Sequence, residues 1–390
     1  MTYLVITPET SVVWEQRLLL AIILLVAYVW IAYPLLLAVL RRLETRPVVR
    51  HEPMGMPFVS LIVPVHNEET RIAAKLQDCL DLDYPKHLLD ISVVSDNSND
   101  GTEALVQEFA RRDARIRLLR TEGRAGKSGA QNLAAAQARG EILFLTDANT
   151  RTGPDTLKAL VQNFSDPRVG LVSATVYFGQ PVDAVSRGQG LYWRYEYALR
   201  QAESDLGTLA TGGGQAMAIR KSLFRPIPPI YGDDCVLPLD VRLNGYRVLN
   251  DPAVIVFDTS PHTIDGELRA RARMTSRNWT GTLSRSALLN PFRFPMTALG
   301  LVSHKLLRWL TPFLLGVVFA LNTALLLQER WAGLWLVQVL FYSSALVGWL
   351  FARKDRPSGV FAYPFSFCLA NVGFFLGIVR ALRNQKITAY

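Results

Sequence analysis

Charged residues are missing from four long stretches of this 390-residue chain. No Asp, Glu, Lys or Arg occurs at 18–40, 309–328, 331–352 or 357–379. A helix of about 20 apolar residues spans the ~30 Å hydrocarbon core of a bilayer, whereas buried helices of soluble proteins rarely stay uncharged for so long. We therefore predict transmembrane helices at 18–40, 309–328 and 331–352. Proline and glycine interrupt the run at 357–379, which is predicted to be transmembrane or re-entrant.

Cysteine is also scarce, since the chain has only Cys79, Cys235 and Cys368, and their spacing matches neither a disulfide framework nor a zinc site. A cleavable signal peptide is not expected, because the first apolar run is too long and no small-x-small site precedes Arg41. No basic platform interleaved with aromatic residues is present, so nucleic acid is not an expected partner. The net charge of +9 instead indicates contact with anionic membrane lipids.

Basic residues flank the apolar runs. Three arginines follow the first run, and the positive-inside rule then places the segment from Arg41 to Arg308 in the cytoplasm. A fourth full crossing would leave the basic residues after position 379 outside, which the same rule disfavours. We therefore expect a multi-pass protein of the inner or plasma membrane with its soluble domain in the cytoplasm, and the course of the last segment stays open.

Strand and helix patterns alternate in the soluble part. Apolar runs at 58–64, 90–95, 116–119 and 142–145 predict strands, and amphipathic helical patterns follow the first three. This order predicts an α/β fold with parallel strands whose loops gather at one edge. Open sheets of this kind bind their ligands at the carboxyl ends of the strands.

Polar residues stand at these strand ends. Asp147 and Asn149 follow the fourth strand, and their oxygen atoms suit a divalent cation. Asp96 can accept a hydrogen bond from a nucleotide base, and Lys127 stands at a helix start, where a phosphate is favoured. Each also has a structural interpretation, a cap or turn for the acidic residues, Glu68 included, and a solvated lysine for Lys127.

The second half of the soluble part adds a glycine-rich bend and an acidic pair. Gly213 lies in a bend where backbone without a Cβ lets a sugar ring approach. Asp233 and Asp234 stand at the start of a helical pattern. They are either catalytic residues or residues that stabilise the N-terminus of the helix. His262 is a candidate metal or phosphate contact, with a plain loop histidine as the alternative. The arginine-rich segment 264–308 predicts amphipathic helices in the lipid interface.

Five short motifs occur in a fixed order. They are IVPVHNE at 62–68, SDNSNDGT at 95–102, GKSGAQN at 126–132, DAN at 147–149 and GDD at 232–234, followed by LNGYR at 243–247. Together they resemble the signature series of family 2 glycosyltransferases over roughly residues 58–260. With apolar runs on both sides, the chain is similar to the membrane-bound branch that includes the cellulose, chitin and hyaluronan synthases.

The resemblance implies a GT-A fold, with a Rossmann-like nucleotide-sugar half joined to an acceptor half. It implies that Asp96 holds the base, that Asp147 and Asn149 hold Mg²⁺ or Mn²⁺, and that Asp234 is the catalytic base. The remaining implied contacts are Pro64, Glu68 and Lys127 on the nucleotide sugar, with Asp233 beside the base. The chain departs from the family pattern in having Asn149 in place of a second Asp and Asp233 in place of Glu.

The acceptor is less closely defined. Arg273, Arg277 and Trp279 stand where processive polymerases carry Gln-x-x-Arg-Trp, but no register supplies the complete motif. The expected reaction is therefore inverting transfer from a nucleoside-diphosphate sugar, UDP-sugar first, to a growing polysaccharide or a glycolipid. Single-sugar transfer to a lipid-linked acceptor and a non-catalytic sugar-nucleotide-binding regulator are the alternatives. Accessory secretion subunits are candidate partners of the polymerising form.

The predicted organisation divides the chain into eight segments. These are an N-terminal segment at 1–17, a transmembrane helix at 18–40, a linker at 41–57, a glycosyltransferase domain at 58–263, interfacial helices at 264–308, transmembrane helices at 309–328 and 331–352, and a transmembrane or re-entrant helix at 357–379.

Overall fold

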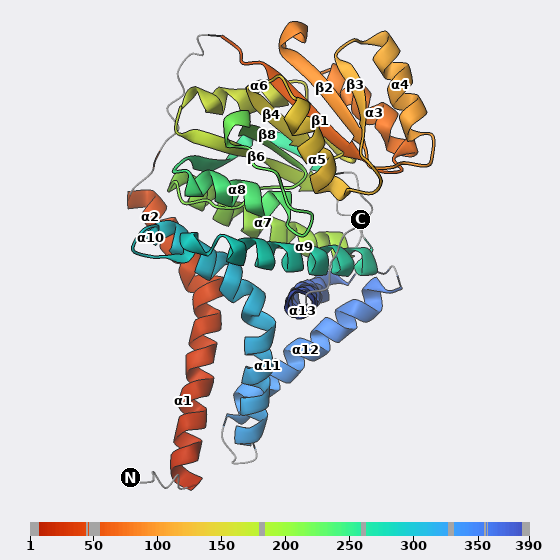
Figure 1. The fold of residues 1–390 in the computed structure, drawn as a ribbon. Coiled ribbons are helices and arrows are strands. Elements are labelled where there is room, and N and C mark those ends of the chain that lie inside the picture. Colours follow the sequence, from red (N-terminus) through yellow and green to blue (C-terminus); the bar gives the residue numbers. More distant parts are fainter. Residues whose placement is uncertain are drawn as a thin grey trace.

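The computed structural model describes residues 8–43, 46, 55–178, 184–258, 263–326, 331–354, 356 and 358–383. His262 therefore lies outside the described residues. An eight-stranded sheet forms the centre of the upper part of the molecule, in the order β3-β2-β1-β4-β7-β6-β8-β5 (Figure 1). The strands are β1 Val59–Val65, β2 Leu89–Ser95, β3 Ile116–Arg120, β4 Ile142–Thr146, β5 Thr150–Thr152, β6 Val169–Phe178, β7 Ala216–Arg220 and β8 Arg247–Asp258.

The first half of the sheet is parallel, as predicted. β1 pairs in parallel with β2 and with β4, and β2 pairs in parallel with β3. The second half is mixed, because β7 runs antiparallel between β4 and β6, and β5 runs antiparallel to β8. The loops after β1, β2 and β4 therefore open on the edge where β7 begins.

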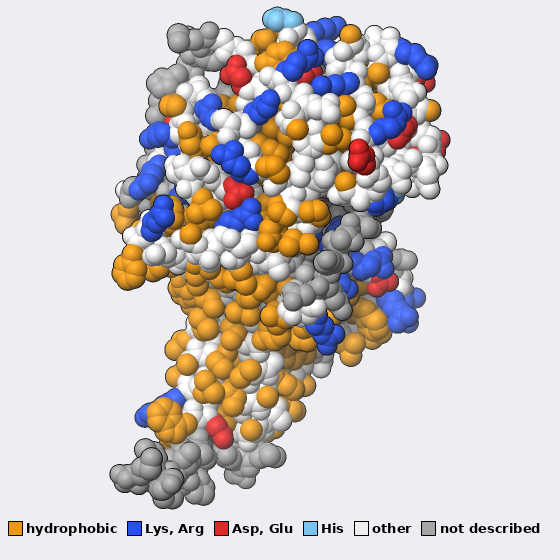
Figure 2. All heavy atoms as spheres, viewed as in Figure 1, with side chains coloured by type: hydrophobic (Ala, Val, Ile, Leu, Met, Phe, Trp, Pro, Cys, Tyr) orange, Lys and Arg blue, Asp and Glu red, His pale blue; other side chains and the backbone are white. Residues whose placement is uncertain are grey.

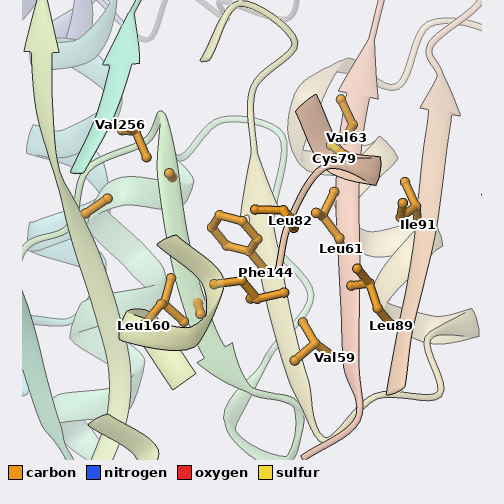
Figure 3. Close-up of a cluster of buried hydrophobic side chains, with 14 of the residues drawn as sticks. Val59, Leu61, Val63, Cys79, Leu82, Leu89, Ile91, Phe144, Leu160 and Val256 are labelled. Atoms are coloured by element: carbon orange, nitrogen blue, oxygen red, sulfur yellow. The ribbon is translucent and has the colours of Figure 1, made fainter. Parts of the chain in front are cut away.

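Helices cover both faces of the sheet (Figure 1). They are α3 Glu69–Leu80, α4 Thr102–Arg112, α5 Gly126–Gln137, α6 Thr156–Gln162, α7 Ala184–Asp205 and α8 Asp233–Leu243. On one face, Val59, Leu61 and Val63 of β1 point into a core that includes Phe144 (Figure 3). The intervening residues of β1 and β4 face α5, because successive side chains of a strand point to opposite faces.

Long apolar helices form the lower part of the molecule, whose visible surface is largely hydrophobic (Figure 2). They are α1 Pro8–Ala27, continued by a π-helical turn η1 Tyr28–Ala32 and α2 Tyr33–Leu43; α10 Pro295–Gly300, continued by a π-helical turn η6 Leu301–Leu306 and α11 Leu307–Leu326; α12 Ala332–Ala352; and α13 Ala362–Leu382. Four stretches, 13–43, 295–326, 332–352 and 359–382, are long and apolar enough to cross a membrane. The prediction of one such helix before the sheet and three after it is confirmed. The second begins at Pro295, earlier than the predicted 309.

The last helix takes a different direction from the others. Figure 1 shows α13 nearly end-on, whereas α1 and α11 run along the plane of the view. α13 packs against α9 Ile264–Ser284, the amphipathic helix that lies beneath the α/β domain. Two glycines four residues apart permit this contact. A Cβ at Gly377 would lie 2.5 Å from Thr275 Cβ, and one at Gly373 would lie 2.9 Å from Arg271 Cδ.

Candidate active site

The ammonium group of Lys127 connects the loops that follow two different strands. Its Nζ lies 2.7 Å from Oδ1 of Asp147 and 3.1 Å from Oδ2 of Asp233. It also donates a 2.7 Å hydrogen bond to the carbonyl oxygen of Gly214. Lys127 reaches this position because α5 begins at Gly126, whose φ of 70° lies in the left-handed region that glycine adopts without strain.

Asp234 lies beside the same glycine-rich bend. A Cβ at Gly214 would lie 3.5 Å from Asp234 Cβ, 3.8 Å from Lys127 Nζ and 3.9 Å from Asp233 Oδ1. A side chain at position 214 would therefore fill the space that these three groups share. The side-chain nitrogen of Asn278, from α9, donates a hydrogen bond of 3.3 Å to Oδ2 of Asp234. α9 thus takes part in the site.

The two neighbouring carboxyl groups have opposite pKa shifts. Burial raises the pKa of Asp234, the charge of Asp233 raises it further, and the hydrogen bond from Asn278 opposes the rise. Burial also acts on Asp233, but Lys127 and a hydrogen bond from Gln131 hold its pKa below the usual range. Asp233 is therefore the fixed anion of the pair, and Asp234 is the member that binds a proton more readily, as a general base requires.

Asp147 has the environment of a cation ligand. Withdrawal from water raises the pKa of Asp147 to about 6; Lys127 opposes the rise, and Asp233 and Asp258 add to it. A divalent cation would remove this penalty, because carboxylate oxygens are its preferred ligands. The side-chain nitrogen of Asn149 donates to Oδ1 of Asp258 at 3.2 Å, so its own side-chain oxygen is not used in this bond.

These oxygen donors fit Mg²⁺ or Mn²⁺, although the chain does not enclose the ion by itself. Within the described residues, no group of three or more His, Cys, Asp or Glu side chains is arranged to hold a metal. Mg²⁺ is commonly bound by one or two carboxylates together with substrate phosphates and water. The fit therefore requires a phosphate-bearing ligand beside Asp147.

The predicted base contact, Asp96, is engaged by the loop before α5. Its Oδ1 accepts hydrogen bonds from the backbone of Ala125 at 2.6 Å and from the hydroxyl of Thr121 at 3.1 Å, and its Oδ2 accepts one from the backbone of Gly126 at 3.0 Å. The side chain thus fixes the start of the helix that carries Lys127. Only 1% of it is exposed, so Asp96 supports the site through the loop.

Three other predicted residues have described contacts that do not involve the acidic groups. Glu68 precedes α3 and bonds Arg71 at 3.0 Å on the surface, while Pro64 lies inside β1, where it pairs with Val94. The backbone nitrogen of Gly213 donates to Ser173 Oγ at 2.7 Å. None of these described contacts links Glu68, Pro64 or Gly213 directly to Asp147 or Asp234.

The predicted acceptor residues on α9 separate into two directions. Arg277 donates to Ser128 Oγ at 3.1 Å and to the carbonyl oxygen of Tyr231, and so ties α9 to the loop before α8. Trp279 points the other way and packs edge-on against Trp309 of α11, with ring centroids 6.3 Å apart. Arg273 lies one turn before Arg277 on the same helix and is partly exposed.

Two side-chain amide groups near the acidic pair were not predicted from the sequence. The side-chain nitrogen of Gln131 donates to Asp233 at 2.9 Å, and Asn278 bonds Asp234. Gln131 lies within the GKSGAQN motif, so its position four residues after Lys127 on one helix face was an available signal. Asn278 lies 44 residues from its partner in the sequence, and no local pattern indicates it.

A narrow cavity of about 40 Å³ extends from Asp234 toward the apolar helices. Its walls come from α7, the glycine-rich bend, α9, η6, α11 and α13. Among the lining residues are Thr211, Asp234, Thr275, Asn278, Trp309 and Phe374. The catalytic candidate therefore faces the boundary between the α/β domain and the helices below it.

A buried ionic cluster forms part of the wall of this cavity. Glu196 of α7 accepts from Arg200 at 3.0 Å, Lys305 at 2.9 Å, Arg308 at 2.6 Å and His304 at 3.0 Å. The other ring nitrogen of His304 bonds Glu203, which also accepts from Tyr33 of α2. The cluster explains how charged residues are accommodated at the start of an apolar helix, since each is paired. It also joins the first and second apolar helices to α7.

Comparison with known proteins connects these features to a family. Residues 60–227 match the model for Glycosyl transferase family 2. An N-acetylglucosaminyltransferase of Rhizobium meliloti is 29% identical over 293 residues, which cover 69% of this chain and 63% of the relative. A beta-monoglucosyldiacylglycerol synthase of Trichormus variabilis is 28% identical over 170 residues, covering 43% of this chain and 36% of the relative. The chain thus spans less than two thirds of the length of these curated relatives.

A solved structure resembles the whole architecture. It is a mannosyltransferase from Pyrobaculum calidifontis in complex with GDP-Man and Mn²⁺, with a TM-score of 0.73 and 24% sequence identity. The match covers 94% of this chain and 99% of that one, so the likeness in fold extends over the apolar helices as well as the sheet. The predicted GT-A fold is confirmed by this likeness together with the family match.

Proposed function

We propose that this chain, which carries a glycosyl transferase family 2 domain at residues 60–227, transfers a sugar from a nucleoside-diphosphate sugar to a hydroxyl group of a membrane-borne acceptor, with inversion of configuration. One observation carries the proposal: Asp147 and Asp233 meet at Lys127, and Asp234 borders the same space beside Gly214. A leaving group and a base can therefore act on one sugar placed between them.

The residues divide the chemistry between two sides. On the diphosphate side, Lys127 at the start of α5 favours anionic oxygens, and Asp147 with Asn149 would hold Mg²⁺ or Mn²⁺. When bound, the ion would supply electrostatic stabilisation of the departing diphosphate. On the acceptor side, Oδ1 or Oδ2 of Asp234 takes the proton of the attacking hydroxyl. Attack from the face opposite the leaving group accounts for inversion.

The donor is a nucleoside-diphosphate sugar, with UDP-sugars as the first candidates. The similar structure from Pyrobaculum calidifontis contains GDP-Man and Mn²⁺, so guanosine donors belong in the same screen. Asp96 supports this side of the site by fixing the loop before α5. We expect the base to lie near that loop.

Transfer of one sugar is favoured over polymerisation. The cavity beside Asp234 is small, about 40 Å³, and the Glu196 cluster forms part of its wall, which suits a short acceptor better than a long polysaccharide. The Gln-x-x-Arg-Trp pattern of processive enzymes is also incomplete on α9. One similar protein, the beta-monoglucosyldiacylglycerol synthase, is named for a glycolipid product, which supports transfer of a single sugar.

Polysaccharide synthesis is the second candidate function. It is supported by the family resemblance of the five motifs and by the presence of several apolar helices where one would suffice for docking to a lipid. Product length separates the two functions, because a polymerase yields a ladder of products from one acceptor.

We further propose that the α/β domain, together with α13 and Arg383, lies on the cytoplasmic side of an inner or plasma membrane. α13 runs across the direction of α1 and α11 and packs on α9, which supports an interfacial course without a fourth crossing. Arg380 and Arg383 then stay on the same side as the domain, which satisfies the positive-inside rule. Labelling of single cysteines at positions 383 and 331 with an impermeant reagent tests this, since only 383 should react from the cytoplasmic side.

The decisive test of the activity is a donor screen. The full chain in detergent or nanodiscs is incubated with a panel of radiolabelled UDP- and GDP-sugars, membrane lipids and Mn²⁺ or Mg²⁺. Transfer of label to lipid, lost in Asp147→Ala together with metal-dependent nucleotide binding, supports the proposal. Binding of a sugar nucleotide without hydrolysis or transfer under any condition would instead favour the non-catalytic regulator.

A further inference from the structure

We infer that the cavity beside Asp234 binds the uncharged, hydroxyl-bearing head group of a membrane lipid, so that the acceptor is a neutral glycolipid. The inference rests on the proposed transferase function and specifies its acceptor. It depends on three properties of the cavity, which are its unpaired polar atoms, its balance of charge and its apolar wall.

Polar atoms without partners gather around the base. The hydroxyl oxygens of Thr211 and Thr275 and the side-chain oxygen of Asn278 are buried, and none has a hydrogen-bond partner among the described residues. All three residues line the cavity together with Asp234. Buried polar groups in proteins are almost always hydrogen-bonded, so an exception that lines a site indicates a ligand that supplies the partner.

Thr275 is the most informative of the three. Only 1% of this residue is exposed, and it lies in the middle of α9. A threonine in a helix commonly bonds the carbonyl oxygen one turn earlier, and Thr280 of the same helix does so with Ser276 at 3.0 Å. Thr275 makes no such bond. Its hydroxyl can therefore serve a hydroxyl of an acceptor sugar, since both groups donate and accept.

The charges of the cavity disfavour a phosphate. Its three permanent cations, Arg200, Lys305 and Arg308, all donate to the single carboxylate of Glu196. A phosphate placed among them would compete with Glu196 and would also face the carboxylate of Asp234. An uncharged sugar ring with hydroxyl groups neither competes with Glu196 for these cations nor is repelled by Asp234.

The wall on the membrane side is apolar. Trp309 of α11 and Phe374 of α13 line the cavity and belong to one buried cluster, with Trp279 packed against Trp309. An acceptor with its hydroxyls at Thr211 and Thr275 therefore has aromatic rings beside it, and the lipid chains continue toward the hydrophobic lower surface (Figure 2). Aromatic side chains with one apolar side suit this boundary. Met274 also lines the cavity, and its unbranched side chain can adopt another rotamer to widen it.

The test uses threonine-to-valine exchanges, which remove a hydroxyl at nearly constant shape. Thr211→Val and Thr275→Val are each expected to raise the KM for the lipid acceptor about three- to tenfold, the range for loss of one neutral hydrogen bond. The dissociation constant for the nucleotide, measured with Mn²⁺, should stay unchanged in both. Thr280→Val is the matched control on α9, because its hydroxyl is already bonded within the helix and does not line the cavity.

Thermal stability separates ligand binding from a structural role. Because the Thr275 hydroxyl has no described partner, Thr275→Val should keep or raise the Tm, whereas a hydroxyl that supports the fold would lower it. A lowered Tm with an unchanged acceptor KM overturns the inference.

The acceptor class is tested with vesicles of phosphatidylcholine that contain a monoglycosyl diacylglycerol or a polyprenyl phosphate, and with a soluble methyl glycoside. The inference expects transfer to the glycolipid well above transfer to the other two. Preference for the polyprenyl phosphate overturns the neutral head group, and equal use of the methyl glycoside overturns the lipid. Absence of turnover with every donor and acceptor would overturn the proposed function as well. Turnover with an unchanged acceptor KM in both valine variants overturns only this inference.

Discussion

The side-chain nitrogen of Asn278 donates a hydrogen bond to Oδ2 of Asp234 at 3.3 Å, and so connects the helix beneath the domain to the candidate base. A Cβ at Gly232 would lie 2.5 Å from Asn278 Oδ1 and 2.5 Å from Asp234 Oδ1, so the glycine permits this approach. The orientation of the base therefore depends on where α9 lies. Since α9 packs on α13, contacts with the apolar helices can influence the base.

The first prediction concerns pH. The Asn278 hydrogen bond lowers the pKa of Asp234, while burial and Asp233 raise it. Asn278→Ala removes the lowering effect, so the acid limb of the kcat/KM profile should move to higher pH, because the base must lose its proton to act. Asn278→Asp adds a carboxylate and should move the limb further. An acid limb at the wild-type pH in both variants, with Thr280→Val as the control, would contradict the role given to Asn278.

The second prediction concerns the base. Asp234→Asn keeps the shape of the side chain but cannot accept the proton, so turnover should fall by about 10²- to 10⁴-fold. Affinity for the nucleotide sugar should stay close to wild type, since the exchange leaves Lys127, Asp147 and Asp233 on the diphosphate side unchanged. Single-turnover rates and equilibrium binding measure the two effects separately. Transfer at the wild-type rate would exclude Asp234 as the base.

A third prediction follows from the position of Lys127 between two carboxylates. Lys127→Met leaves Asp147 and Asp233 without their shared ammonium group, and unfolding free energy should fall by about 3 kcal/mol, as when one partner of a buried ion pair is removed. Mn²⁺ should then raise the Tm more in the variant than in wild type, because the cation replaces the lost charge. Lys158→Met, which removes an ion pair with the largely exposed Asp83, is the control and should change little. Equal Mn²⁺ effects on all three proteins would argue against a cation at Asp147.

The fourth prediction concerns the contact between α13 and α9. A Cβ at Gly377 would meet Thr275 Cβ at 2.5 Å and the carbonyl oxygen of Ala272 at 2.8 Å, so Gly377→Ala forces the two helices apart. The expected cost is about 1–3 kcal/mol, the usual range for overpacking. Gly316→Ala and Gly333→Ala are matched controls in the other apolar helices, because nothing lies within 4 Å of a Cβ at either position. Thermal unfolding in detergent measures the difference, and a Tm equal to that of the controls would show that α13 does not pack on α9.

Part of the site could be read from local patterns. Asp147 follows directly on an apolar strand, and Lys127 begins a helix, so the alternation of strands and helices placed both at one edge of the sheet. The glycine-rich bend and the acidic start of α8 were likewise visible as short motifs. These features depend on residues within a few positions of one another, and a sequence displays such relationships directly.

Other features depend on contacts between distant segments. The insertion of β7 antiparallel between β4 and β6, the meeting of Asp147 and Asp233 at Lys127, and the approach of Asn278 to Asp234 all join segments that are separate in the sequence. No periodicity marks such partners, because any of several polar residues on α9 satisfies the same amphipathic pattern. The choice is made when the helices pack.

The sequence by itself determined the α/β fold, the four apolar helices and the acidic residues at the strand ends, because strand and helix periods and uncharged length are local properties. The tertiary structure decided which acids share Lys127, how α9 brings Asn278 to Asp234, and that α13 crosses beneath the domain against α9. Those outcomes depend on side-chain packing at Gly214, Gly232 and Gly377, where a missing Cβ lets separate segments meet.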